Sequence, residues 1–157
     1  MKTRRQEFRG SRGAAGVAAV EFVIAVPLLI FVALAVAELG RAFVQYDKLS
    51  YAVRSSARYV SENAIDYKTG EVMISELVAG RARNLAVYGT TSGGGTPGLP
   101  GFKPGHVSVL RAGENDIEVT ATYPYQPLIG TALPLFGGDS AATLFTMKIA
   151  VVMRAIS

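Results

Sequence analysis

The residues best placed to do chemistry lie where a basic segment meets an apolar one. Glu21 is the only charged residue in the apolar run of residues 17–37, and it follows Gly16 by five positions. A carboxylate inside a membrane helix costs roughly 2.5–3.5 kcal/mol on insertion scales, so it is by default a functional group with a partner. If the chain is cut after Gly16, the new amino group of Val17 lies close to Glu21. In an assembly, this amino group of one subunit can neutralise Glu21 of its neighbour and remove much of the desolvation cost.

Simpler explanations exist for this acid and for the charged residues that follow it. Glu21 can be an acid that reaches the cytoplasmic interface of the membrane, and Glu38 can be a surface acid that pairs with Arg41 three residues later. Arg54 and Arg58 indicate either a solvated face or a contact between subunits. We therefore treat all five as candidates for contacts between subunits.

Little in the sequence could support catalysis. His106 is the only histidine, and no motif fixes a serine or an acid near it. The absence of cysteine excludes disulfides, thiol nucleophiles and cysteine metal sites. Residues 89–105 are rich in glycine but lack the Gly-Lys-Ser/Thr of a phosphate-binding loop, and their three collagen-like triplets are too few for a triple helix. We expect no enzymatic activity, cofactor or small-molecule substrate, and we interpret residues 89–105 as an exposed flexible linker.

The element that positions Glu21 is a predicted transmembrane helix over residues 17–40. Its apolar run matches the 20 or so residues that a membrane-spanning helix needs, and it has no polar stripe. Pro27 lies inside the run, which a membrane helix tolerates with a kink. A cleaved secretory signal is the competing interpretation. Its apolar region spans about 7–15 residues and ends at a small-residue site, whereas this run is longer and ends at Glu38.

The distribution of charge indicates topology. The protein is 50% hydrophobic and only 18% charged, against about 25% charged residues in soluble domains. Residues 1–16 contain five basic residues and one acid, whereas residues 17–157 contain eleven of each. The net charge of +4 is thus a property of a basic leader and does not indicate nucleic-acid binding. The positive-inside rule places residues 1–16 in the cytoplasm and residues 41–157 outside it.

Residues 41–64 continue the same helix. They have an amphipathic face that repeats every three or four residues and comprises Phe43, Tyr46, Leu49, Val53, Ser56, Ala57 and Val60. A helix over residues 17–64 would be about 70 Å long, far more than a bilayer needs. Its outer half must therefore cover other elements or pack against neighbours.

The remaining elements predict a small α+β domain. A second helix is expected over residues 71–88, with Thr69 as its N-cap and Gly89 as its stop. Its apolar side comprises Ile74, Leu77, Val78, Leu85 and Tyr88.

The predicted sheet spans residues 106–154. Residues 106–110 and 116–123 should form a hairpin with a turn around Gly113, and the second strand should bury Ile117, Val119, Ala121 and Tyr123. Prolines exclude regular structure over residues 124–138. The last strand, residues 143–153, is more apolar, so we expect it to be central.

Several segments resemble a known family. Gly16 followed by Glu21-Phe22 resembles the processing site of type IV-like pilins, in which a prepilin peptidase cuts after the glycine and the acid is the fifth mature residue. A cut after Gly13 would instead place Ala18 at that position. Downstream segments resemble the TadE family of the Tad (Flp) pilus system, namely Pro27-Leu28-Leu29, residues 38–41, Gln45, residues 52–59, residues 119–128 and the closing Met153-Arg154.

The resemblance implies a pilin-like fold and a minor pilin or pseudopilin that acts in Tad pilus assembly. It implies cleavage between Gly16 and Val17, with Glu21 and Phe22 in the recognition site. The implied partners are the prepilin peptidase, other pilin or pseudopilin subunits, inner-membrane pilus assembly proteins and the lipid bilayer, with no nucleic acid. The implied location is the bacterial inner membrane, with residues 41–157 in the periplasm, or the pilus itself. An unprocessed single-pass anchor with a partner-binding outer domain, and a membrane-tethered enzyme, are the alternatives.

Overall fold

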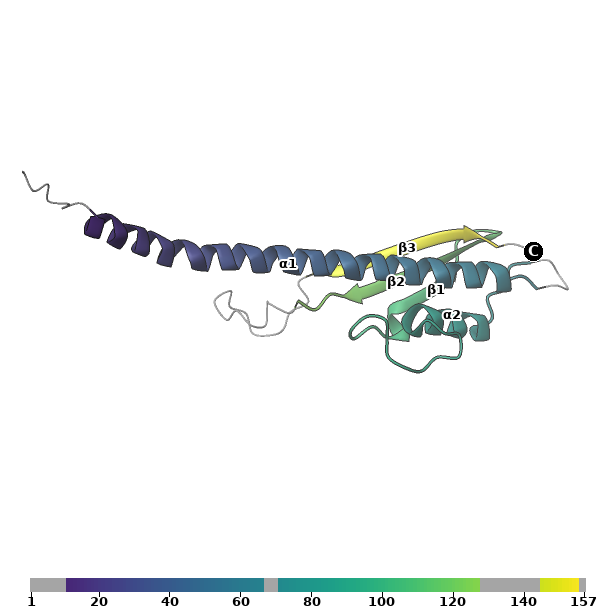
Figure 1. Ribbon diagram of the computed structural model, residues 1–157. Helices are drawn as coiled ribbons and strands as arrows, with labels where there is room; N and C mark the ends of the chain where they lie inside the picture. The colour runs from purple at the N-terminus through teal and green to yellow at the C-terminus, as the bar shows by residue number, and fades with distance from the viewer. Residues whose placement is uncertain (1–10, 67–70, 128–144, 156–157) are drawn as a thin grey trace, which may run out of the picture. The chain divides into compact units, whose positions relative to one another are not determined.

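The computed structural model describes residues 11–66, 71–127 and 145–155, and the chain divides into two compact units, Met1–Leu39 and Gly40–Ser157. Helix α1 (Ser11–Asn63) begins in the first unit and ends in the second. The second unit also contains α2 (Glu76–Tyr88), a 3₁₀ helix η1 (Pro104–His106) and the strands β1 (Val107–Arg111), β2 (Asp116–Pro124) and β3 (Thr146–Arg154) (Figure 1). The protein is α+β, with a long apolar amino-terminal helix, as the sequence predicts.

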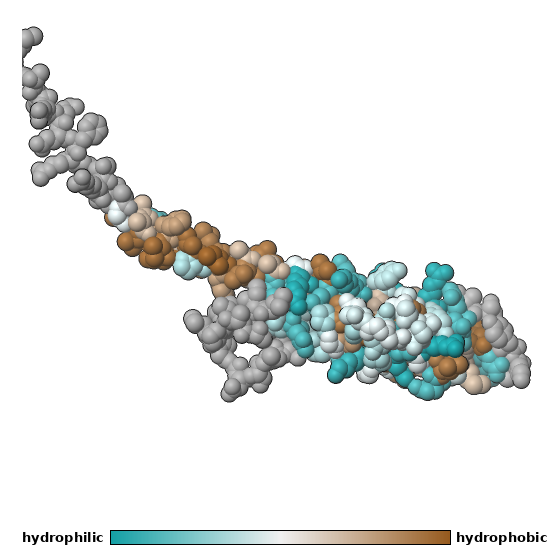
Figure 2. Space-filling model, turned by 60° about the horizontal axis from the view of Figure 1, so that its bottom comes forward, coloured by the Kyte–Doolittle hydropathy of each residue, from teal (hydrophilic) through white to brown (hydrophobic). Residues whose placement is uncertain are grey.

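In the first unit, the described part of α1 is covered with exposed apolar side chains. The helix is long and apolar enough from Gly16 onward to cross a membrane, and its most apolar window is not buried. Figure 2 shows these side chains as an almost continuous hydrophobic surface. The helix is thus consistent with the predicted single membrane span, whereas its orientation stays a prediction.

In the second unit, α1 buries one face. Leu49, Val53 and Val60 are completely buried, as predicted from their spacing. Phe43, however, is 63% exposed and Tyr46 is 46% exposed, so their assignment to the buried face is wrong. Ala42 and Gln45, one position earlier in each turn, are buried instead, and Gln45 contacts β2 through a hydrogen bond. At about 100° per residue, a shift of one position moves a side chain to another face of a helix.

The sheet has the antiparallel order β1-β2-β3. The predicted hairpin between β1 and β2 is confirmed, with Val109 opposite Val119, and the Ala112 N–H donates to the Asp116 carbonyl (2.8 Å) across its turn. The guanidinium of Arg111 donates to the carbonyls of Gly113 (2.7 Å) and Glu114 (2.6 Å), which fixes the turn.

The prediction that the last strand is central is wrong, because β3 lies at an edge and β2 is the middle strand. Along β3, buried Met147 and Ile149 alternate with exposed Thr146, Lys148 and Ala150. The strand therefore has one solvated face, and part of its apolar content lies on that face. Strand β2 buries Ile117, Val119, Ala121 and Tyr123, as predicted.

Helix α2 begins at Glu76, five residues later than predicted. Its N-cap is Ser75, whose hydroxyl accepts the N–H of Val78 (3.3 Å), while Thr69 lies outside the described residues. Before the cap, the chain is extended, since the Met73 N–H donates to the Ala64 carbonyl (2.7 Å). An N-cap serine satisfies a backbone donor of the first turn, which explains why the helix starts there.

The far end of α2 agrees with the prediction. The predicted apolar side agrees in part, since Ile74, Val78 and Tyr88 pack partly buried against the core. Gly89 ends the helix in the left-handed conformation at φ 73°. Leu77, predicted to lie on the apolar side, is 63% exposed. The residues that α2 buries are small, namely Ala79, Ala82, Ala86 and Val87.

Residues 89–103, the greater part of the predicted linker, form no helix or strand but pack onto the core. Leu99 and Phe102 are almost fully buried, so the expectation of an exposed linker is wrong at these residues. The Phe102 ring meets the Tyr123 ring edge-on, with 5.8 Å between centroids.

Of the proline-containing segment 124–138, Pro124 belongs to β2, against the prediction, and residues 125–127 form no helix or strand, as predicted. Its remaining residues lie outside the described part of the chain.

Candidate functional site

The predicted processing residues lie together on an exposed stretch of α1. Val17, Glu21 and Phe22 all expose their side chains, and Val17 and Glu21 are four positions apart, so they share one helix face. Apart from its chain neighbours and the backbone of its own helix, no described atom lies within 4 Å of the position that a Cβ on Gly16 would occupy. Packing within the described residues thus does not require a glycine here.

The bond between Gly16 and Val17 lies inside the helix, because α1 begins at Ser11 rather than at the predicted residue 17. A peptidase that reads an extended backbone must unwind this segment first. Each helical glycine weakens a helix by about 0.5–1 kcal/mol relative to alanine, so Gly13 and Gly16 make unwinding easier. Cleavage would also create a new helix start at Val17, where the helix dipole and the amino group both favour a nearby carboxylate such as Glu21.

The other candidate contact residues have different surroundings. Glu38 and Arg41 are half-buried, and Arg54 is exposed. The Arg58 Nε donates to Glu62 Oε1 (2.9 Å) one turn further along α1, and this hydrogen bond and the charge of Glu62 raise the pKa of Arg58. Arg58 is therefore already engaged within its own helix.

Three polar side chains that the sequence did not single out as contacts hold the second unit together. The Ser56 hydroxyl donates to the Ala82 carbonyl (2.8 Å) and joins α1 to α2 in the core. The Tyr123 hydroxyl on β2 faces two acceptors, Gln45 Oε1 (3.1 Å) and the Pro100 carbonyl (3.0 Å). For Gln45 and Ser56, the available signal was a polar residue at a three- or four-residue step within an apolar helix face, and for Tyr123 it was a hydroxyl on the predicted buried face of the strand.

Tyr123 is the buried titratable group of this network. Burial raises the pKa of its hydroxyl, and the positive charge of Arg41 partly opposes this shift. The hydroxyl therefore stays protonated well into the alkaline range and can donate to its acceptors throughout neutral pH.

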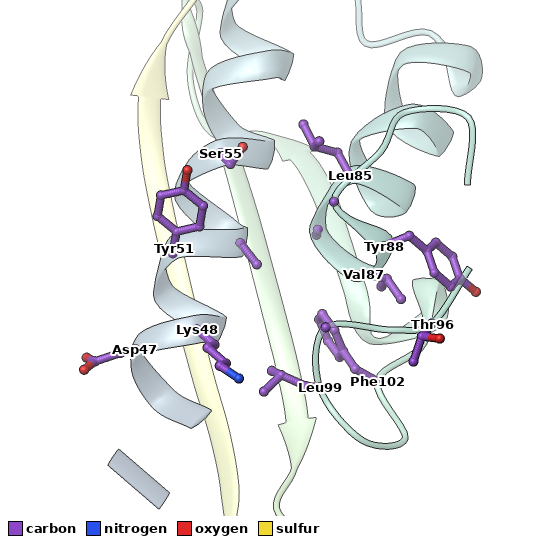
Figure 3. A pocket seen from close by; sticks show the side chains of 14 residues that line it. Asp47, Lys48, Tyr51, Ser55, Leu85, Val87, Tyr88, Thr96, Leu99 and Phe102 are labelled. Carbon is purple, nitrogen blue, oxygen red and sulfur yellow. The ribbon is translucent and has the colours of Figure 1, made fainter. Parts of the chain in front are cut away.

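A groove of about 660 Å³ opens between α1, α2 and the loop that follows α2. Figure 3 shows Tyr51 and Ser55 on one wall and Leu85 and Tyr88 on the other, with the Lys48 amine directed inward. A lone lysine and an acid at the rim, without histidine, make no recognisable catalytic constellation.

His106 has a structural contact, since its Nδ1 accepts the Lys103 N–H (3.4 Å) across η1. Within the described ranges, no group of three or more histidine, aspartate or glutamate side chains is placed to hold a metal ion. The absence of a cofactor stays a prediction.

Comparison with known proteins identifies the segment that carries these candidate residues. The family model described as TadE-like protein matches residues 16–58. Over these residues, the chain is similar to TadE-like proteins. No curated protein and no solved structure matches the chain. TadE-like proteins are components of Tad pili rather than enzymes.

The TadE-like segment begins at the predicted cleavage glycine and ends at Arg58. It contains the whole processing site, all the candidate contact residues, and the two α1 side chains, Gln45 and Ser56, that bond to the rest of the second unit. The sheet and α2 lie outside it. The family match therefore covers the apolar part of α1 and the face of α1 that forms hydrogen bonds with α2 and β2.

Proposed function

We propose that this chain is a minor pilin or pseudopilin of a Tad pilus system, and that a prepilin peptidase cuts it after Gly16. The observation that supports this most is that the TadE-like match starts at Gly16, which is the one glycine before the apolar run that places an acid at the fifth position after the cut. The mature chain would begin at Val17.

The chemistry of assembly rests on Glu21. Its carboxylate projects from an apolar helix surface, so in a membrane or a helix bundle it must find a cation. The amino group of Val17 on an incoming subunit supplies that cation, and the pair costs far less to bury than either charge alone. Pairing between subunits would thus favour assembled over isolated helices.

The second unit supplies the outer domain. Its core is built on the face of α1 that follows Gly40, so each α1 that joins an assembly brings a folded sheet with it. In this proposal, the protein contributes a membrane helix and a binding domain, and no catalysis.

The processing step is tested by coexpression with a prepilin peptidase in cells where the enzyme cuts a control pilin. Intact mass and amino-terminal sequencing should give a chain that begins at Val17. The variant Gly16→Ala should remain uncut, while Gly40→Ala, whose position is equally open, should be processed normally. Recovery of the uncut wild-type chain would favour an unprocessed membrane anchor.

The role of the acid is tested separately. Glu21→Ala should insert into the membrane but reduce the number of pili per cell, because the Val17 amino group loses its partner. The neighbouring Val20→Ala changes side-chain size without charge and serves as the control. Electron microscopy counts the pili, and normal piliation with Glu21→Ala would refute this role.

A further inference from the structure

We propose that the outer edge of β3 binds an extended, acidic segment of a partner protein by strand addition. The proposal goes beyond the pilin role, and the edge itself does not depend on cleavage at Gly16. Only the argument against a second copy as the occupant rests on the membrane anchoring proposed above.

The hydrogen bonds at the two ends of β3 show which of its residues face outward. The Tyr125 N–H donates to the Phe145 carbonyl (3.2 Å), and the Ala155 N–H donates to the Asn115 carbonyl (2.8 Å). In an antiparallel ladder, every second residue bonds to the neighbouring strand and those between point the other way. The outward-pointing backbone groups belong to Thr146, Lys148, Ala150, Val152 and Arg154.

Within the described part of the chain, the outer edge of β3 is unpaired. All five residues are exposed, and among the described residues no backbone group of another segment bonds to them. Figure 1 shows β3 at the side of the sheet opposite β1, where α2 packs. Proteins normally shield an edge by making it short, by a bulge, a proline, an inward charge, or charged side chains on the strand, lysine above all. Strand β3 pairs over nine residues in unbroken register and has no proline, and its shielding charges, Lys148 and Arg154, are both basic, so they repel a basic strand but not an acidic one.

The apolar side of the same edge is incompletely covered. On β2, Ile117 and Val119 are fully buried, whereas their β3 partners Met153 and Val151 are only half-buried. A strand added beside β3 would cover these two side chains. The occupant should therefore carry β-branched residues on that face, as strands generally do.

The positive charges of β3 favour an acidic binding partner. Both charged residues of β3, Lys148 and Arg154, are basic, and both project from the solvated face. Asp116 on β2 lies opposite Arg154, but the residue opposite Lys148 is the uncharged Thr122. An acidic residue of an added strand beside Lys148 would complete a cross-strand pair of opposite charges.

A second copy of β3 is a poor occupant. Antiparallel pairing would turn the two α1 helices in opposite directions, so that their Gly40 ends could not lead into the same membrane. Parallel pairing in register would bring Lys148 beside Lys148 and Arg154 beside Arg154, which is repulsive, and a shifted register would shorten the paired segment. The occupant is thus a segment of a different protein.

The test uses the full chain in detergent micelles and a fluorescent nine-residue peptide. The peptide alternates threonine and valine, with glutamates at its third and seventh positions, so that one glutamate meets Lys148 in either direction. Fluorescence anisotropy should show saturable binding, and a peptide with lysines in place of the glutamates should bind several-fold more weakly. Amide exchange of Lys148, Ala150 and Val152 should slow on binding.

Two variants locate the site. Lys148→Glu should weaken the glutamate peptide several-fold and strengthen the lysine peptide. Ala150→Pro removes an outward N–H while leaving the ladder to β2 intact, and should weaken both peptides about tenfold. The uncut Gly16→Ala variant should bind like wild type, which separates this test from that of processing. Absence of binding, unchanged affinity in Lys148→Glu, or peptide-induced dimerisation of the chain without amide protection would overturn the proposal.

Discussion

At the scale of single residues, Tyr123 joins three parts of the second unit. Its hydroxyl lies between a side chain of α1 and a carbonyl of the loop that follows α2, and its ring packs against Phe102. A buried polar group of this kind adds little free energy when satisfied but is costly to leave unpaired. The hydrogen bond between Tyr123 and Gln45 therefore favours the packing in which the Gln45 turn of α1 lies against the sheet.

Replacing Tyr123 with phenylalanine should lower the free energy of unfolding by about 1 kcal/mol, because Gln45 Oε1 and the Pro100 carbonyl lose the single O–H that they share. Chemical denaturation of the full chain in micelles measures this change. Tyr59→Phe, at a half-buried position on α1, serves as the control. An unchanged midpoint for Tyr123→Phe would show that the hydroxyl carries no net stabilisation.

The raised pKa of Tyr123 also predicts a dependence on pH. Above the usual tyrosine pKa of about 10, the unfolded chain loses this proton while the folded chain keeps it. The folded state then binds more protons, so stability falls as the pH rises from about 10 to the folded-state pKa. Unfolding experiments across this range should give a shallower alkaline loss for Tyr123→Phe than for wild type, and equal slopes would contradict the assignment.

At the scale of elements, α2 contains two glycines with opposite roles. Gly80 lies inside the helix with open space around it, whereas Gly89 ends the helix with positive φ. Gly80→Ala should stabilise the protein by about 0.5–1 kcal/mol, because alanine favours helix. Gly89→Ala should destabilise it by about 1 kcal/mol, because a Cβ is strained in the left-handed conformation.

Thermal unfolding of the two variants, followed by circular dichroism, measures both effects with the same substitution. Changes of the same sign would show that α2 does not end as described. The comparison reports the effect of backbone conformation rather than of side-chain contacts, since neither added methyl group would contact another part of the structure within 4 Å.

Some helices and strands were predicted correctly from local sequence patterns, whereas other features depend on contacts between distant segments. Apolar content and length predicted α1, and alternation predicted β2 and its hairpin, because these patterns arise from local geometry. Phe43, Leu77 and Leu99 were misplaced because large apolar residues were assumed to be buried and a glycine-rich loop to be exposed. Which face of α1 is covered depends on where distant strands pack, and no local pattern reports that. The edge position of β3 is likewise a property of pairing.

The candidate functional residues also include some that the sequence alone reveals and some that only the folded structure reveals. The spacing of Gly16 and Glu21 can be seen in the sequence alone, since it depends only on helical geometry. The bonds of Ser56 and Tyr123 join residues 26 and 78 positions apart, so only the folded chain reveals them.

At the scale of the whole molecule, the second unit should fold without the first. Its core draws on α1 only from Ala42 onward, and the apolar run lies before that point. A chain limited to residues 40–157 should be soluble and give a circular dichroism spectrum with both helix and sheet. A chain limited to residues 65–157 should not fold, because Ile117 and Val119 would lose the helix that covers them. An insoluble or unfolded 40–157 chain would contradict this prediction.

The small side chains that α2 buries limit which substitutions the protein can accept at these positions. Ala79, Ala82 and Ala86 are buried, and the backbone carbonyl of Ala82 accepts the Ser56 hydroxyl of α1 (2.8 Å). A side chain larger than a methyl group at the completely buried Ala82 would displace its neighbours and strain that hydrogen bond. In a saturation library of the chain, these three sites should accept little beyond glycine and serine, while the exposed Leu77 beside them should vary freely.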